Sequence, residues 1–141
     1  QLACHMLVEQ CNEDKRLLIA AEHVDEVGDE LVRWGEAHLR YWWDTASPAE
    51  RAVLAVAAES PESAEALTAE AAAQRLHREG VALDTALLAR ALDHLVERDL
   101  LADRGQGTGV FRLCAGLAGR WVGAHWPVER VAHALRRSEW A

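Results

Sequence analysis

The chain has 141 residues, of which 50% are apolar and 27% are charged, a balance typical of a folded globular protein and sufficient for one ordinary domain or two small ones. It contains no run of about eighteen uncharged apolar residues, which argues against a membrane-spanning helix, and its three cysteines suit a reducing cytoplasm better than a disulfide scaffold. No signal-peptide pattern is visible, and we therefore expect a soluble cytoplasmic protein without membrane contact. The missing initiator Met and the immediate apolar-periodic pattern suggest a fragment of a longer chain.

The net charge of −8 is unevenly distributed along the chain. Residues 1–97 carry 19 acidic and 8 basic side chains, a net of −11, whereas residues 98–141 carry 7 arginines and 4 acidic side chains, a net of +3. Most of the chain should therefore repel nucleic acid, and only its C-terminal third could attract it.

The N-terminal part is predicted to be helical. Apolar residues gather on one face over residues 1–14 and recur at helical spacing over residues 21–44, which predicts two amphipathic segments. Gly35 should bend the second segment or divide it into two helices.

A capping box gives the clearest local signal in the sequence. Ser47 can accept free amide hydrogens of a first helical turn, and Pro48 loses nothing there by lacking one. Glu50 stands where its carboxylate would reach back to the serine amide. The pattern predicts a helix over residues 48–59, followed by a surface loop at residues 60–63.

Two more short helices are expected after this loop. Thr68 begins the first, over residues 68–79, and Gly80 follows at the position that favours a left-handed backbone. Asp84 caps the second, over residues 85–98.

Two short apolar runs, residues 100–102 and 110–113, flank the glycine-rich segment 104–109, which predicts a β-hairpin. This segment lacks the lysine of a phosphate-binding loop and does not open a helix. Helices over residues 117–125 and 128–137 should complete the chain. Three helices followed by a hairpin is the order of a winged helix-turn-helix, so we expect a mainly α fold with a small β-hairpin.

The sequence resembles the C-terminal lid and winged-helix region of bacterial STAND-type, AAA+-related ATPases. Upstream, residues 2–8 and 19–25 are similar to the small helical lid that follows the nucleotide-binding core. The entry to the family's winged helix is similar to residues 41–54. Its third helix and first wing strand are similar to residues 92–101, and its second wing strand and closing helix look like residues 111–121.

The resemblance implies two parts and a regulatory role. Residues 1–44 would form the helical lid and connector, and residues 45–141 the winged-helix domain with its C-terminal helices. Both would pack on the nucleotide-binding core of the parent protein and couple its nucleotide state to an effector domain or to a homo-oligomer contact. ATP or ADP and Mg²⁺ would bind to the parent protein, and no cofactor is expected in this chain.

The sequence departs from the family in one respect. Related proteins can present a histidine to the nucleotide from a Met-His-Asp context, but the only methionine here is Met6, followed by Leu7, so no histidine takes over this role. The chain also lacks a G-x-x-x-x-G-K-[ST] loop and any convincing Ser, His and carboxylate set. We therefore expect no enzymatic activity from the chain itself.

Metal binding is not the favoured interpretation of its histidines and cysteines. Structural zinc sites usually show two closely spaced ligand pairs. His125 and His133 are eight residues apart and have no such second pair. The candidate metal ligands near the N-terminus are Cys4, His5, Cys11 and His23. For these, buried cysteines that act as small apolar residues are the better interpretation.

The third helix of the expected winged helix decides between DNA and protein as the partner. Its buried face should consist of Leu88, Ala91, Leu92 and Leu95. The opposite face then carries Ala86, Arg90, Asp93, His94 and Glu97. One arginine against two carboxylates is a poor match to phosphate, so protein contact is favoured over DNA contact.

Six tryptophans supply further candidates for partner contact. We expect Trp42 and Trp121 to lie in the core, and Trp126 and Trp140 to be the better candidates for contact. Together with basic residues of the third helix and the wing, the possible partner or DNA contacts are Arg90, His94, Arg104, Arg112, Arg120, Trp126 and Trp140.

Overall fold

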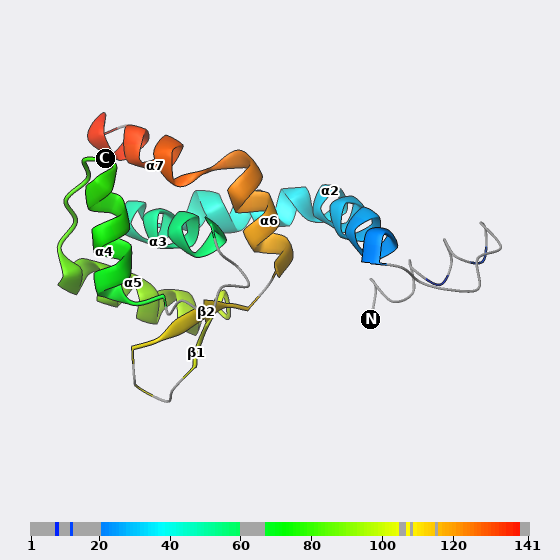
Figure 1. The fold of residues 1–141 in the computed structure, drawn as a ribbon, viewed down its shortest axis with the longest axis horizontal. Helices are drawn as coiled ribbons and strands as arrows, with labels where there is room; N and C mark the ends of the chain where they lie inside the picture. The colour runs from blue at the N-terminus through cyan, green and yellow to red at the C-terminus, as the bar shows by residue number, and fades with distance from the viewer. Residues whose placement is uncertain are drawn as a thin grey trace.

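The computed structural model describes residues 8, 12, 21–59, 67–104, 107, 109–114 and 116–138. Within these residues it contains six helices and one two-stranded antiparallel sheet (Figure 1), which confirms the mainly α class with a small hairpin. The elements are α2 (Ala21–Thr45), α3 (Pro48–Glu59), α4 (Ala69–Arg78), α5 (Thr85–Glu97), β1 (Leu101–Asp103), β2 (Phe111–Leu113), α6 (Gly116–His125) and α7 (Val128–Arg136).

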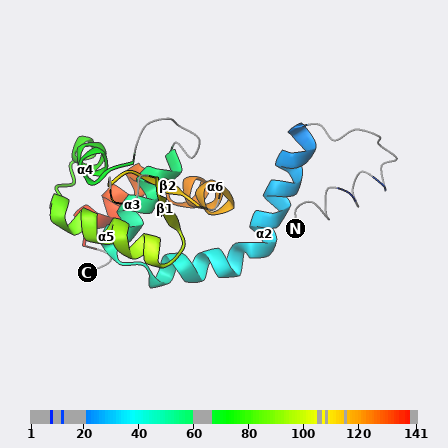
Figure 2. The ribbon, with the colours of Figure 1, turned by 90° about the horizontal axis from the view of Figure 1, so that it is seen from below.

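The long N-terminal segment forms one continuous helix, α2, through Gly35. The helix is not straight: it changes direction part-way along its length (Figure 2), so bending rather than division is the outcome. No helix in the described part of the chain is long and apolar enough to cross a membrane. The amphipathic segment expected over residues 1–14 lies outside the described residues, apart from positions 8 and 12.

The predicted helix starts agree with the observed caps. The Thr68 hydroxyl accepts the Ala71 amide hydrogen at 3.1 Å and begins α4. The Asp84 carboxylate accepts the Ala86 amide hydrogen at 3.1 Å and begins α5. Each cap satisfies an amide that has no partner within its own helix, which is why short polar side chains mark these starts.

The hairpin pairs β1 with β2 in antiparallel register, with Leu101 opposite Leu113. Leu67, at the entrance to α4, forms an isolated bridge with Phe111. The turn of the hairpin needs glycine: the φ angles of Gly107 and Gly109 are 98° and 71°, a region in which side chains with a β-carbon are strained.

Helix α3 lies at the centre of the fold and contacts α4, α5, α6, α7 and β2. Its small side chains, such as Ala52 and Ala55, are buried and allow the neighbouring helices to approach closely. The buried face predicted for the third helix is confirmed, because Leu88, Leu92 and Leu95 of α5 are fully buried and Ala91 is nearly so.

The last turns of α2 join the same core. Trp43 stacks on Trp126 with ring centroids 5.0 Å apart and meets the edge of Trp121 at 6.3 Å. Trp121 is 3% exposed, which confirms its predicted place in the core, while Trp42 is half-buried and packs against the core. The boundary drawn at residue 44 thus falls where α2 ends, and both sides of it contribute to one cluster of buried residues. Trp34, by contrast, is 67% exposed.

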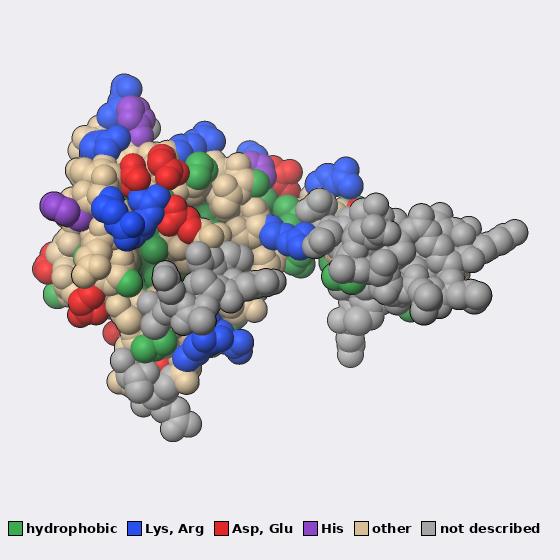
Figure 3. All heavy atoms as spheres, viewed as in Figure 1, with side chains coloured by type: hydrophobic (Ala, Val, Ile, Leu, Met, Phe, Trp, Pro, Cys, Tyr) green, Lys and Arg blue, Asp and Glu red, His purple; other side chains and the backbone are tan. Residues whose placement is uncertain are grey.

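Charged side chains tie three helices together on the surface. Arg75 of α4 forms ion pairs with Glu59 of α3 at 2.6 Å, with Glu79 at 2.7 Å, and with Glu129 of α7 at 2.9 Å. Acidic and basic side chains lie interleaved over this region of the molecule (Figure 3). The geometry explains why the pKa of Arg75 is raised: hydrogen bonds to the glutamates favour the charged guanidinium.

Candidate functional site

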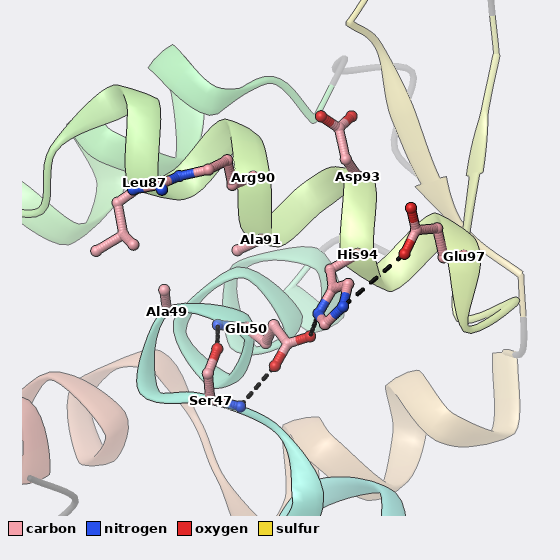
Figure 4. Close-up of a pocket in the computed structure, with 9 residues that line it drawn as sticks. All are labelled: Ser47, Ala49, Glu50, Leu87, Arg90, Ala91, Asp93, His94 and Glu97. Carbon is pink, nitrogen blue, oxygen red and sulfur yellow. Dashed lines mark hydrogen bonds and ion pairs between the residues drawn. The ribbon is translucent and has the colours of Figure 1, made fainter.

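A shallow groove of about 430 Å³ runs between the start of α3 and the outward face of α5 (Figure 4). The predicted outward face of α5 is confirmed as exposed, since all five of its residues are exposed: Ala86, Arg90, Asp93, His94 and Glu97. Side chains from both helices line the groove: Ser47, Ala49, Glu50, Leu87, Arg90, Ala91, Asp93, His94 and Glu97.

Glu50 is a buried charged residue, with only 4% of its surface exposed. The capping box predicted for it is present, since its Oε2 accepts the Ser47 amide hydrogen at 2.6 Å and its own amide donates to the Ser47 hydroxyl at 3.3 Å. The cap fixes one carboxylate oxygen at the first turn of α3 and leaves the other, Oε1, pointing at α5.

The second oxygen of Glu50 bonds to His94 of α5. His94 Nδ1 lies 3.1 Å from Glu50 Oε1, and its Nε2 lies 3.8 Å from a carboxylate oxygen of Glu97 (Figure 4). His94, a possible partner or DNA contact by sequence, has one edge of its ring occupied within the chain. Its side chain is still 66% exposed, so it remains accessible on the rim of the groove.

The charge of Glu50 is stabilised despite its burial. Burial acts to raise the pKa of its carboxyl, but hydrogen bonds from Ser47 and His94 and the positive charge of Arg98 outweigh it and hold the pKa below its ordinary value. Arg98 Nη1 is 3.7 Å from Glu50 Oε1. The groove therefore contains a fixed negative charge at neutral pH, paired internally with groups of α5.

Arg98 also connects the groove to the end of α2. Its Nη2 donates to the Trp42 carbonyl at 3.2 Å and to the Thr45 hydroxyl at 2.9 Å. Arg51 of α3 donates to the carbonyls of Trp43 and Asp44, both at 3.0 Å. Burial lowers the pKa of the Arg51 guanidinium, and the charge of Asp44 opposes this effect.

These two arginines place donors and positive charge beside the carbonyls at the C-terminal end of α2. The last carbonyls of a helix have no partner within the helix, and a positive charge beside them is favourable. Helix α2 has no basic residue in its own last turn. Arg51 of α3 and Arg98, directly after α5, donate to these carbonyls in addition to the Thr45 hydroxyl and the Ala46 amide. The end of α2, the start of α3 and the end of α5 therefore meet at one junction, which we call the α2–α3–α5 junction.

The outward face of α5 is unfavourable for phosphate. Asp93 and Glu97 are both exposed, and Arg90 is the single arginine of the groove lining. The negative end of the helix dipole also lies near Glu97, at the last turn of α5. Each carboxylate would have to approach a DNA backbone of the same charge.

The predicted wing arginines lie apart from the groove lining. Arg104 follows β1 and Arg112 lies within β2, opposite Ala102, and both are exposed. The Asp103 carboxylate accepts the Gly107 amide hydrogen at 2.6 Å, which stabilises the turn of the hairpin.

Arg120 and Trp126 belong neither to the groove lining nor to the hairpin strands. Arg120 of α6 faces α2, with its guanidinium 3.0 Å from the place that a β-carbon on Gly28 would take. Trp126 is half-buried between Trp43 and the Arg130 guanidinium, which lies 4.3 Å from its ring centre. Most of the Trp126 ring thus serves internal packing, and Trp140 lies outside the described residues.

No group of three or more His, Cys, Asp or Glu side chains in the described part of the chain could hold a metal ion. Cys4, His5 and Cys11, considered as ligands from the sequence, lie outside that part, and so does the side chain of His23. His125 stacks on Trp121 and bonds to its carbonyl at 2.9 Å, which gives that histidine a packing role.

Comparison with known proteins offers no relative from which a role could be transferred. No protein-family model matches the chain, and neither does any curated protein or solved structure. The functional argument therefore rests on the groove, the junction and the charges themselves.

Proposed function

We propose that this chain is a regulatory, protein-contacting module of a larger STAND- or AAA+-type ATPase. Residues 45–141 would act as a winged helix that packs, together with the helical segment before it, on the nucleotide-binding core of the parent protein. Nucleotide state in that core would then be coupled to contacts with an effector domain or with another copy. The chain by itself would not be an enzyme.

The acidic outward face of α5 carries this proposal. In a DNA-binding winged helix this face enters the major groove. Here it presents the exposed carboxylates of Asp93 and Glu97 beside the single Arg90. A protein partner can complement such a face, whereas a phosphate backbone cannot.

The junction supports the coupling half of the proposal. Arg98 bonds to the end of α2 and lies close to Glu50, while Glu50 bonds to His94 on the rim of the groove. A partner that displaces His94 would thus act on groups that also hold α2 in place. Such a chain of contacts could transmit a change at α5 to the helix that precedes the winged helix.

Binding to random-sequence duplex DNA, at low and at physiological salt, tests the proposal. We expect no retardation of the duplex at either salt. The matched control is the double variant Asp93→Arg, Glu97→Arg, which should gain salt-sensitive binding if the two carboxylates are what repels DNA. Micromolar binding of the unaltered chain that falls steeply with salt would overturn the proposal.

A DNA-binding transcription regulator is the second candidate, favoured by the exposed wing arginines. If the chain binds DNA through the wing, replacing Arg104 and Arg112 by alanine should weaken that binding and reduce its salt dependence. If no duplex is retarded at low salt, where electrostatic attraction is strongest, this second candidate is excluded.

A further inference from the structure

The floor of the groove is apolar. Ala49 of α3 and Ala91 of α5 are nearly buried beneath it, and Leu87 stands at one end with 37% of its surface exposed. Leu87 points toward Ala49 across the groove (Figure 4). Small alanines leave room above them, so the floor can accept one apolar side chain from outside.

The rim of the groove is acidic and only partly used within the chain. Glu50 is fully occupied by Ser47, His94 and Arg98. Among the described residues, Glu97 has one long contact, with His94 at 3.8 Å, and its side chain is 74% exposed. Asp93 is exposed as well. The two exposed carboxylates are four residues apart on α5, so their β-carbons lie about 6 Å from each other on one side of the helix.

We propose that this groove docks a helical segment of a protein partner that presents an apolar side chain one turn away from an arginine or lysine. The apolar side chain would lie over Ala49 and Ala91, and the cation would bond to Asp93 and Glu97. This inference rests on the proposed protein-contact function and names the chemistry of the partner.

The charges of the groove select this occupant over others. Its lining holds three carboxylates and one arginine, and one of the carboxylates is already paired. An acidic segment would meet like charge at the exposed carboxylates of Asp93 and Glu97. A purely apolar segment would cover these carboxylates without offering either of them a hydrogen-bond donor. A basic amphipathic helix satisfies the floor and the rim together.

The test uses two synthetic helical peptides that differ only in charge. Both carry leucine at one position; four residues later one carries arginine and the other glutamate. Each is titrated into the isotope-labelled chain, and backbone amide shifts are followed. The arginine peptide should shift amides of Leu87, Asp93, His94 and Glu97, and it should bind about tenfold more tightly than the glutamate peptide, as two exposed ion pairs allow.

Charge-reversing variants test whether the two rim carboxylates bind the cation of the peptide. Asp93→Lys and Glu97→Lys should each weaken the arginine peptide several-fold and strengthen the glutamate peptide. Glu70→Lys is the matched control, because Glu70 is exposed on α4, outside the groove lining, and the change in net charge is the same. Unchanged peptide binding in the control, with all three variants folded by circular dichroism, would assign the effect to the groove.

The outcomes separate this inference from the function on which it rests. Equal binding of the two peptides, shifts confined to other elements, or no shift at millimolar peptide would overturn the inference and leave the protein-contact function standing. Shifts of the groove amides by duplex DNA, lost at physiological salt, would overturn both.

Discussion

Glu50 performs two tasks with its two carboxylate oxygens. One oxygen caps α3 through the Ser47 amide, and the other bonds to His94 of α5 beside Arg98. A buried charge is costly unless it is paired and hydrogen-bonded, and both conditions are met here. A single residue thereby links the start of one helix to the outward face of another.

Replacing Glu50 by glutamine should reveal this charge through pH. The pKa of Glu50 is lower in the folded chain than its ordinary value of 4.5. Its ionised carboxylate therefore stabilises the fold above pH 4.5, and this stabilisation is lost as the pH falls through the pKa of the folded state. We expect E50Q to reduce the free energy of unfolding by about 1 kcal/mol at neutral pH. Urea unfolding should show this difference shrinking toward zero on acidification. A difference independent of pH would mean that the loss comes from the hydrogen-bond pattern and not from charge, because glutamine replaces one accepting oxygen by a donating amide.

The Thr68 cap offers a second test at this scale. Thr68→Ala removes the hydroxyl that accepts the Ala71 amide and should lower the free energy of unfolding by about 1 kcal/mol. Thr85→Ala is the control: the same chemical change falls on the first residue of α5, where the side chain of Asp84 provides the cap. Thermal unfolding of both variants measures the two losses of stability. Equal destabilisation of the two variants would contradict a capping role for Thr68.

At the scale of elements, Arg75 binds α3, α4 and α7 to one another. Its side chain is only 18% exposed and faces three glutamates, so its removal leaves three carboxylates that repel one another. Networks of this kind contribute more than isolated surface pairs.

We expect Arg75→Met to lower the free energy of unfolding by about 2 kcal/mol at low salt, between the values for exposed and buried pairs. High salt should reduce the loss, because it screens the repulsion among Glu59, Glu79 and Glu129. Arg40→Met is the matched control: its pair with Glu36 is exposed, and the expected loss is under about 0.5 kcal/mol. Equal losses in both variants, measured by urea unfolding, would show that the network adds nothing.

Local patterns predicted the elements well because their causes are local. The caps at Ser47, Thr68 and Asp84 and the buried face of α5 depend on residues within a few positions of each other. The contact between Glu50 and His94 spans 44 residues, and that between Arg75 and Glu129 spans 54. Periodicity tells which face of a helix is buried, but not which helix lies opposite.

One signal for the site was nevertheless present in the sequence. Glu50 lies in line with Val53, Leu54 and Ala57 at helical spacing, all of them buried. A carboxylate on an otherwise apolar face predicts an internal partner as well as a cap. The partner itself, on α5, depends on the tertiary arrangement.

At the scale of the whole molecule, the groove and α2 meet at the α2–α3–α5 junction. Helix α2 ends without a basic residue of its own, and Arg51 and Arg98 donate to carbonyls of its last turn. Arg98 belongs to the same short chain of contacts as Glu50 and His94. The stability of the end of α2 should therefore depend on groups at the rim of the groove.

Arg98→Met tests this dependence directly. The variant keeps an unbranched side chain but loses the donors to Trp42 and Thr45, so amides in the last turn of α2 should exchange hydrogen about tenfold faster. Arg112→Met, on the exposed face of the hairpin, is the control and should change no exchange rate in α2. Because global destabilisation would speed exchange everywhere, amides of α4 serve as the internal reference. Equal acceleration in α2 and α4 would show that Arg98 supports overall stability only, and unchanged protection of α2 would remove the proposed link between the groove and the helix before it.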